Sequence, residues 1–175
     1  MDKVRCKKIG IKILSIITIV SLIFTNILPI TIGAATPSVQ TTNEFRNKVA
    51  YNWRYIARGD YGNNCLSYAL GDVSPAQRWY WPWGDRNPSR GEAKSLLYSY
   101  GYKNQADAGE NVTFPGSREI YAYYLNGAIT HFAVAIGSPS NTSAKWGHCE
   151  IFGHNNQNPY TNYLYGHMTF KANYS

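Results

Sequence analysis

A lone cysteine opens the apolar part of the stretch Asn63-Asn64-Cys65-Leu66-Ser67-Tyr68-Ala69-Leu70-Gly71. Asn64 is a good helix N-cap, so this pattern predicts a short helix that begins at Cys65. Further along, the run Thr130-His131-Phe132-Ala133-Val134-Ala135-Ile136 predicts a strand with a histidine near its start. A helix start and a nearby imidazole both lower the pKa of a thiol. Cys65 and His131 are therefore the expected nucleophile and base of a cysteine hydrolase.

The N-terminal part of the chain predicts mainly helices. The residues Thr41-Thr42-Asn43-Glu44 form a capping box, which predicts a helix running towards Ile56. After a long aromatic loop over residues 72–88, a second box, Ser89-Arg90-Gly91-Glu92, precedes apolar side chains at helical spacing. That apolar stripe ends at Gly101 and is expected to pack into the core.

The C-terminal part predicts strands. Residues 120–125 and 129–136 flank Asn126-Gly127, the strongest short signal for a hairpin turn. Two further strands are expected over residues 144–152 and 163–171. Helices followed by strands predict an α+β domain in which the Cys65 helix packs on a C-terminal antiparallel sheet.

Residues 1–35 have the pattern of a secretory signal peptide, with basic residues, an apolar run and then Gly33-Ala34-Ala35. We therefore expect a secreted or envelope-associated protein with no stable membrane anchor after cleavage. The leader holds five of the 17 basic and one of the 10 acidic residues, which leaves 12 basic and 9 acidic ones. A net charge this small, without a Lys/Arg block, gives no support for nucleic-acid binding. Residues 36–58 are expected to form a lead-in and helix, and residues 59–175 the catalytic domain.

The alternation of side chains along the expected strand 129–136 suggests how Cys65 and His131 approach each other. His131 shares a face with Ala133 and Ala135, whereas Phe132 points to the other face. Because the two alanines are small, we expect the Cys65 helix to cross their face and bring thiol and imidazole within reach. His131 would then take the thiol proton, and N–H groups at the helix start would stabilise the oxyanion.

A disulfide is the main alternative for Cys65, since Cys149 is the other cysteine outside the leader. Such a bridge would indicate a non-enzymatic secreted domain that binds glycan or protein through its Trp and Tyr side chains. A second alternative keeps the Cys/His pair but uses it for acyl transfer or crosslinking, because an amine can complete the reaction in place of water.

These residues resemble the papain-like superfamily of bacterial NlpC-type and CHAP-type cysteine peptidases and amidases. The closest likeness is to an uncharacterised bacterial family in that group, through the Asn-Cys-x-x-Tyr-Ala-x-Gly motif at 64–71, the Trp/Pro loop, Thr130-His131-Phe132-Ala133 and the segment 143–154. The likeness covers about residues 61–171. It implies a papain-like α+β fold and a monomeric enzyme without a cofactor. It also implies a peptide or peptidoglycan substrate, with cleavage of an amide in cell-wall or other envelope peptides.

A third catalytic residue should follow His131 and accept its Nδ1–H, which fixes the tautomer. The family pattern favours His154, its last histidine. Glu150 is the best candidate on electrostatic grounds, because a carboxylate would also stabilise an imidazolium. Ser143, Asn141 and His148 lie in the same segment and stay open.

Other patterns allow weaker predictions. Trp79, Trp81 and Trp83 are expected either to line a substrate cleft or to form a small core of their own. Zinc is disfavoured, because His148 and Cys149 are adjacent in an expected strand and face opposite ways. Lys145 is expected to be a solvated strand lysine.

Overall fold

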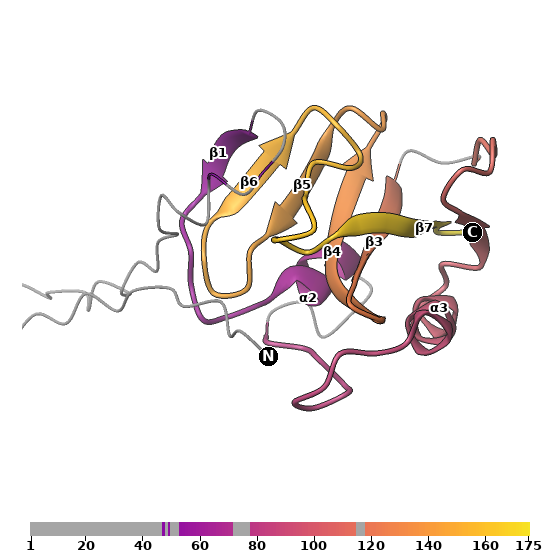
Figure 1. Cartoon of the computed structure of the whole chain (residues 1–175), viewed down its shortest axis with the longest axis horizontal. Helices are drawn as coiled ribbons and strands as arrows, with labels where there is room; N and C mark the ends of the chain where they lie inside the picture. The colour runs from indigo at the N-terminus through magenta and orange to yellow at the C-terminus, as the bar shows by residue number, and fades with distance from the viewer. Residues whose placement is uncertain (1–46, 48, 50–52, 72–77, 115–117) are drawn as a thin grey trace, which may run out of the picture.

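A single antiparallel sheet dominates the structure (Figure 1). The computed structural model of the chain describes residues 47, 49, 53–71, 78–114 and 118–175. Its seven strands lie in the order β1-β6-β5-β4-β3-β7-β2, and two helices accompany them in the described residues. The elements are β1 (Trp53–Ala57), α2 (Cys65–Leu70), α3 (Arg90–Ser99), β2 (Asn104–Asp107), β3 (Arg118–Leu125), β4 (Ala128–Ile136), β5 (Thr142–Lys145), β6 (Ile151–His154) and β7 (His167–Asn173).

The hairpin of β3 and β4 is the centre of the sheet, and it confirms the prediction from the Asn-Gly pair. Asn126 and Gly127 have φ values of 51° and 89°, as a two-residue hairpin turn with both central residues left-handed requires. The register places Tyr123 opposite His131 and Ala122 opposite Phe132. Because side chains alternate along a strand, Phe132 and Ala133 of β4 lie on opposite faces of the sheet.

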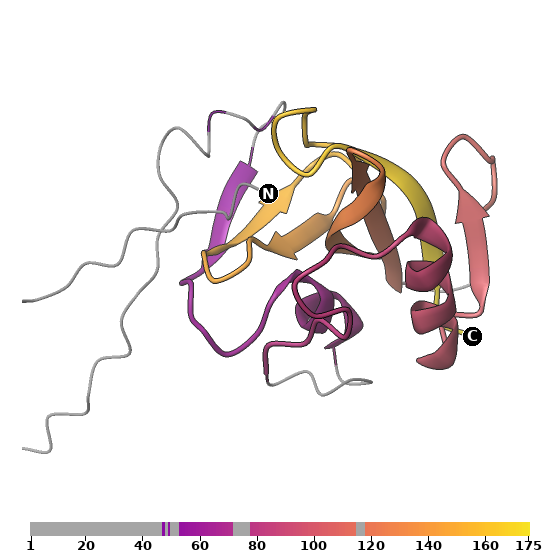
Figure 2. The same ribbon diagram turned by 60° about the horizontal axis from the view of Figure 1, so that its bottom comes forward.

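Two cores lie on the two faces. The helix-side core holds the buried side of α2 and α3 and consists of Cys65, Leu66, Ala69, Leu70, Ala93, Leu97, Tyr102, Ile120, Ala122, Ile129, Phe132, Phe170 and Ala172. The far-side core consists of Tyr121, Tyr123, Ala133, Ala135, Ala144, Trp146, Cys149, Phe152, Tyr160, Leu164 and Tyr165. Figure 2 shows both helices below the sheet, while the connection between β6 and β7 arches over its top.

The predicted α+β, papain-like fold class is wrong, because the fold is β-dominated. Where the C-terminal part of a helix towards Ile56 was expected, the structure has strand β1, which pairs antiparallel with β6. The physical reason is composition: Trp53, Tyr55 and Ile56 are aromatic or β-branched residues that favour strands. As an edge strand β1 leaves Tyr55 55% exposed. The capping box at 41–44 lies outside the described residues, as does the expected leader at 1–35.

The strands after β4 differ in their bounds from the prediction. The expected strand 144–152 is two strands, β5 and β6, which pair with each other across a turn in which Gly147 has a φ of 63°. The last strand begins at His167 rather than residue 163, because Tyr165 and Gly166 both have positive φ. Strand β2 was not predicted, since Asn104-Gln105-Ala106-Asp107 has neither strand propensity nor a clear alternation.

Gly166 makes a specific prediction for stability. Its φ is 76°, and a Cβ there would collide with the carbonyl oxygen of Tyr124 in β3. Gly166→Ala should therefore destabilise the fold by about 3 kcal/mol or more, from left-handed strain plus backbone displacement. Gly147 is the matched control, with a φ of 63° and no other atom within 4 Å of the place a Cβ would take. Gly147→Ala should cost about 1 kcal/mol, and equal losses for the two variants in urea unfolding would contradict the close approach.

Candidate active site

Cys65 begins helix α2, as predicted, and its position is fixed by a reciprocal cap. The Asn64 side chain accepts from the Ser67 amide at 3.0 Å, and the Ser67 hydroxyl accepts from the Asn64 amide at 2.9 Å. The Asn64 side-chain amide also donates to the carbonyl of Tyr80 at 2.9 Å, which joins the helix start to the aromatic loop. Cys65 is a free cysteine and is 7% exposed. The predicted alternative of a Cys65–Cys149 disulfide is therefore wrong.

The surroundings of the Cys65 sulfur act on its pKa in opposite directions. Burial is the largest effect and raises the pKa to about 11. Backbone hydrogen bonds from Phe132, Leu66 and Cys65 itself lower it, and so does the charge of Lys145. The resting thiol is therefore protonated at neutral pH, so it needs a base before it can attack. The amides and the ammonium are placed to stabilise negative charge once it forms.

His131 lies next to Phe132 in β4, but its ring packs against tyrosines of the far-side core. The ring stacks on Tyr165 with centroids 3.7 Å apart and planes 4° apart, and it is fully buried. Burial, with the charge of His154 as a smaller cause, holds the pKa of His131 well below 6.5. His131 is therefore a neutral imidazole at physiological pH.

The predicted approach of α2 over Ala133 and Ala135 is not what the structure shows. Both alanines belong to the far-side core, whereas α2 packs on the face that carries Phe132. Between the described residues Cys65 and His131 there is no hydrogen bond. Instead, the sulfur meets β4 at the backbone of Phe132, one residue away from the histidine.

The predicted third residue, His154, lies near His131 with a tyrosine hydroxyl between them. The Tyr160 hydroxyl is 3.1 Å from His131 Nε2 and 3.4 Å from His154 Nε2, and it accepts from Trp146 Nε1 at 3.3 Å. Burial, and then the charge of Arg54, lowers the pKa of His154 to about 4. Sequence reasoning missed Tyr160, because nothing in its local sequence sets it apart from the other tyrosines.

No residue takes the expected role of acceptor for His131 Nδ1 among those the structure describes. Ser143 instead contacts the Tyr68 hydroxyl at 3.0 Å. Asn141 is exposed and accepts from Arg54 at 2.9 Å. Glu150 is buried, and its charge acts on Lys145.

Lys145 is the site residue for which the expectation from sequence is wrong. Its side chain is 0% exposed, and its ammonium donates to the carbonyls of Asp60 at 3.2 Å and Cys149 at 3.0 Å. The Asp60 carboxylate lies 3.6 Å away. Strand alternation could have given the signal, since Lys145 shares a face with Ser143, and α2 covers that face.

The three loop tryptophans have different environments. Trp81 and Trp83 are half-buried and pack against the helix-side core, with the Trp81 ring 6.0 Å from that of Phe132. Trp79 is 45% exposed and stacks on His148 with centroids 4.0 Å apart, while Tyr61 contacts the same imidazole at 4.6 Å. Trp79 is thus the most exposed of the three.

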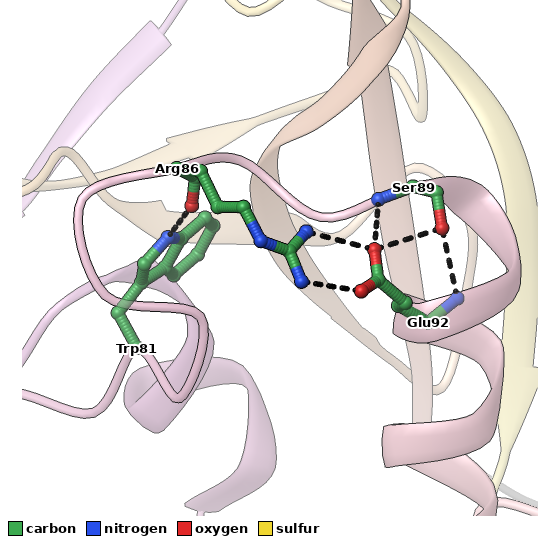
Figure 3. Close-up of polar contacts among 4 residues, drawn as sticks. All are labelled: Trp81, Arg86, Ser89 and Glu92. Atoms are coloured by element: carbon green, nitrogen blue, oxygen red, sulfur yellow. Dashed lines mark hydrogen bonds and ion pairs between the residues drawn. The ribbon is translucent and has the colours of Figure 1, made fainter.

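A salt bridge holds this loop against α3 (Figure 3). The Glu92 carboxylate completes the predicted capping box by accepting from the Ser89 amide at 2.8 Å. It also binds both terminal nitrogens of Arg86, at 2.9 and 2.5 Å, and these contacts lower the Glu92 pKa to about 2. The Arg86 carbonyl in turn accepts from Trp81 Nε1 at 3.0 Å. The described part of this loop is therefore held at Tyr80 by Asn64 and at Arg86 by Glu92.

Comparison with known proteins gives a family but no activity. Residues 54–173 match the family described as Domain of unknown function (DUF7689). The chain belongs to this family. The match runs from β1 to β7, so it spans the whole sheet. No curated protein and no solved structure matches the chain.

Two further observations concern the described residues. Neither helix there is long and apolar enough to cross a membrane. Their His, Cys, Asp and Glu side chains form no group of three or more suited to hold a metal ion.

The buried histidines predict an acid-sensitive fold. The folded pKa of His154 is about 4 against 6.5 for an exposed histidine, so between these values the unfolded chain binds a proton that the folded protein does not. Stability is therefore complete above pH 6.5 and should fall by about 3 kcal/mol from this group as pH drops to 4.

Thermal melts from pH 7.5 to 4 measure this slope. His154→Gln should melt lower at pH 7.5 but lose less stability on acidification than the parent protein. The exposed His167 provides the matched control, and His167→Gln should keep the parent slope. An unchanged slope in His154→Gln would contradict the assignment.

Proposed function

We propose that this protein is a cysteine hydrolase that cleaves an amide bond through a thioester on Cys65. The observation that carries the proposal is the setting of the sulfur, a free thiol that faces the backbone of Phe132 beside His131. Amides from two separate elements and one buried ammonium surround it. Such a setting stabilises both a thiolate and the oxyanion that follows its attack on a carbonyl.

The protonation states favour general-base catalysis over a resting ion pair. The Cys65 thiol is protonated and the His131 imidazole is neutral. The sulfur attacks the carbonyl carbon as its proton passes to an imidazole nitrogen, and the carbonyl π electrons move to oxygen. Collapse of this intermediate breaks the C–N bond, and the imidazolium protonates the leaving amine. Water then hydrolyses the thioester, and the free thiol is restored.

The network around Tyr160 supports different roles for the two histidines. Trp146 Nε1 can only donate, so it occupies one lone pair of the Tyr160 oxygen. If His131 Nε2–H donates to the second lone pair, Tyr160 O–H is free to donate to His154 Nε2. His131 Nδ1 then holds a lone pair, and in the described residues that atom has no other partner. Tyr160 and Tyr165 both contact the His131 ring and both interact electrostatically with Cys65, which supports His131 as the nearest imidazole to the sulfur. In this arrangement Tyr160 and His154 orient His131, and Nδ1 takes the proton once the bound substrate brings the two groups together.

The substrate and the location are proposals that come from the sequence. The leader-like segment supports an exported protein, and the family resemblance supports an amide in a cell-wall or other envelope peptide. Transfer to an amine instead of water would use the same thioester and can be detected as a second product.

Acylation of Cys65 is the direct test. Incubation with p-nitrophenyl acetate or with soluble muropeptides should add an acyl group to the intact protein, and peptide mapping should place it on Cys65. Cys65→Ala should lose the adduct and turnover. His131→Gln should slow acylation by roughly 100-fold or more, whereas His167→Gln should react like the parent.

The outcome that overturns the proposal is a Cys65→Ala protein that folds and keeps full turnover. His131→Gln changes a buried site, so its melting temperature is measured beside its rate. A variant that is folded and acylates at the parent rate would assign the base elsewhere, with His148 as the next imidazole to test.

The exposed stack of Trp79, His148 and Tyr61 favours a second candidate function, binding of a glycan or protein partner. Aromatic rings with exposed edges suit both kinds of ligand. Binding to insoluble cell wall that Trp79→Ala abolishes and Cys65→Ala leaves intact would support this function instead.

A further inference from the structure

Lys145 is a buried cation whose hydrogen bonds all go to the protein itself. Its ammonium has three protons, and it contacts two carbonyl oxygens, of Asp60 and Cys149, and the carboxylate of Asp60. Two of its N–H groups are bonded to carbonyls, and the Asp60 carboxylate lies 3.6 Å away, beyond hydrogen-bond distance. Because the Lys145 side chain is 0% exposed, a substrate carboxylate does not reach it. The charge therefore acts through space and not as a binding group.

The packing of α2 on β5 places this charge at the start of the helix. Tyr68 lies one turn after Cys65, and its hydroxyl contacts Ser143 of β5 at 3.0 Å. Lys145 lies two residues after Ser143 and so on the same face of the strand. Asp60, which precedes α2, contacts the Lys145 ammonium, so the Cys65 end of α2 lies towards the Lys145 end of β5. The two groups also interact electrostatically.

We propose that Lys145 is a positioning residue of the Cys65 site, whose ammonium stabilises negative charge on the sulfur. Under the proposed hydrolase function, on which this part rests, the same charge also stabilises the oxygen of the tetrahedral intermediate. In this role Lys145 acts by its charge and transfers no proton. Its bonds to the carbonyls of Asp60 and Cys149 hold it in place through the reaction.

Other charged and titratable groups also face this pair, and they determine the sign of the test. Asp60 and Glu150 act on Lys145, and His148 lies within the field of both Lys145 and Asp60. On the other side, Tyr160 and Tyr165 interact with Cys65. Asp60 opposes the positive charge that Cys65 experiences, so removing Asp60 and removing Lys145 should have opposite effects on the thiol.

The experiment is a pH titration of Cys65 by NMR, using the 13Cβ signal of labelled cysteine and Cys65→Ser to assign it. Lys145→Met should move the titration to higher pH, with roughly tenfold less thiolate at a fixed pH. Asp60→Asn should move it to lower pH, with more thiolate at that same pH. Lys145→Arg keeps the charge and should titrate like the parent.

Opposite shifts of the Cys65 titration distinguish an electrostatic effect from a disruption of packing. A disrupted site would shift the titration in the same direction in both variants. Coincident titrations, or shifts of the same sign, overturn the proposal. If Lys145→Met does not fold, Lys145→Gln takes its place, and an unshifted Cys65 titration in that variant overturns the proposal. The titration needs no substrate, so its result does not depend on the hydrolase activity. A protein that never acylates would overturn the proposed hydrolase function but not the proposed effect of Lys145 on the thiol.

Discussion

The packing of the start of α2 between the aromatic loop and strands β4 and β5 is the constraint that sets the geometry of the site. Asn64 fixes the helix start to the loop, and Tyr68 fixes the next turn to β5. Between these two contacts the Cys65 sulfur is pressed against the backbone of Phe132 and is removed from water. Desolvation of the thiol is thus a direct result of how the helix is held. The nearby amides and ammonium compensate part of its cost.

A second constraint comes from a cluster of buried polar side chains on the far side of the sheet. Tyr160 joins His131 to His154, and Tyr165 stacks on His131. These residues come from β4, β6 and the β6–β7 connection, so the network ties together segments that are distant in sequence. The Tyr160 hydroxyl fixes the relative positions of the two imidazoles, while both Nδ1 atoms have no hydrogen-bond partner among the described residues. The two constraints meet at neighbouring residues of β4, His131 and Phe132.

Sequence patterns predicted the local features that follow from short-range chemistry. The Asn126-Gly127 turn, the N-cap at Asn64 and the capping box at Ser89 and Glu92 all form as predicted. The fold class failed because pairing partners decide it: β1 becomes a strand by joining β6 at the sheet edge. The site was predicted in part, since Cys65 begins a helix and His131 lies in a strand as expected, whereas His154 lies inside β6 and not beyond the strand. The choice of the β4 face that α2 covers depends on tertiary packing, and so does the burial of Lys145. Neither can be predicted from the spacing of residues along the chain.

Amides from two elements, α2 and β4, converge on the reacting centre at Cys65. A crystal structure of the protein alkylated at Cys65 with iodoacetamide would show whether they bind an oxygen placed there. We expect the adduct oxygen to accept from the amides of Cys65 and Phe132 at about 2.7–3.1 Å. An adduct oxygen that points into solvent, with the Phe132 amide bonded elsewhere, would contradict this convergence.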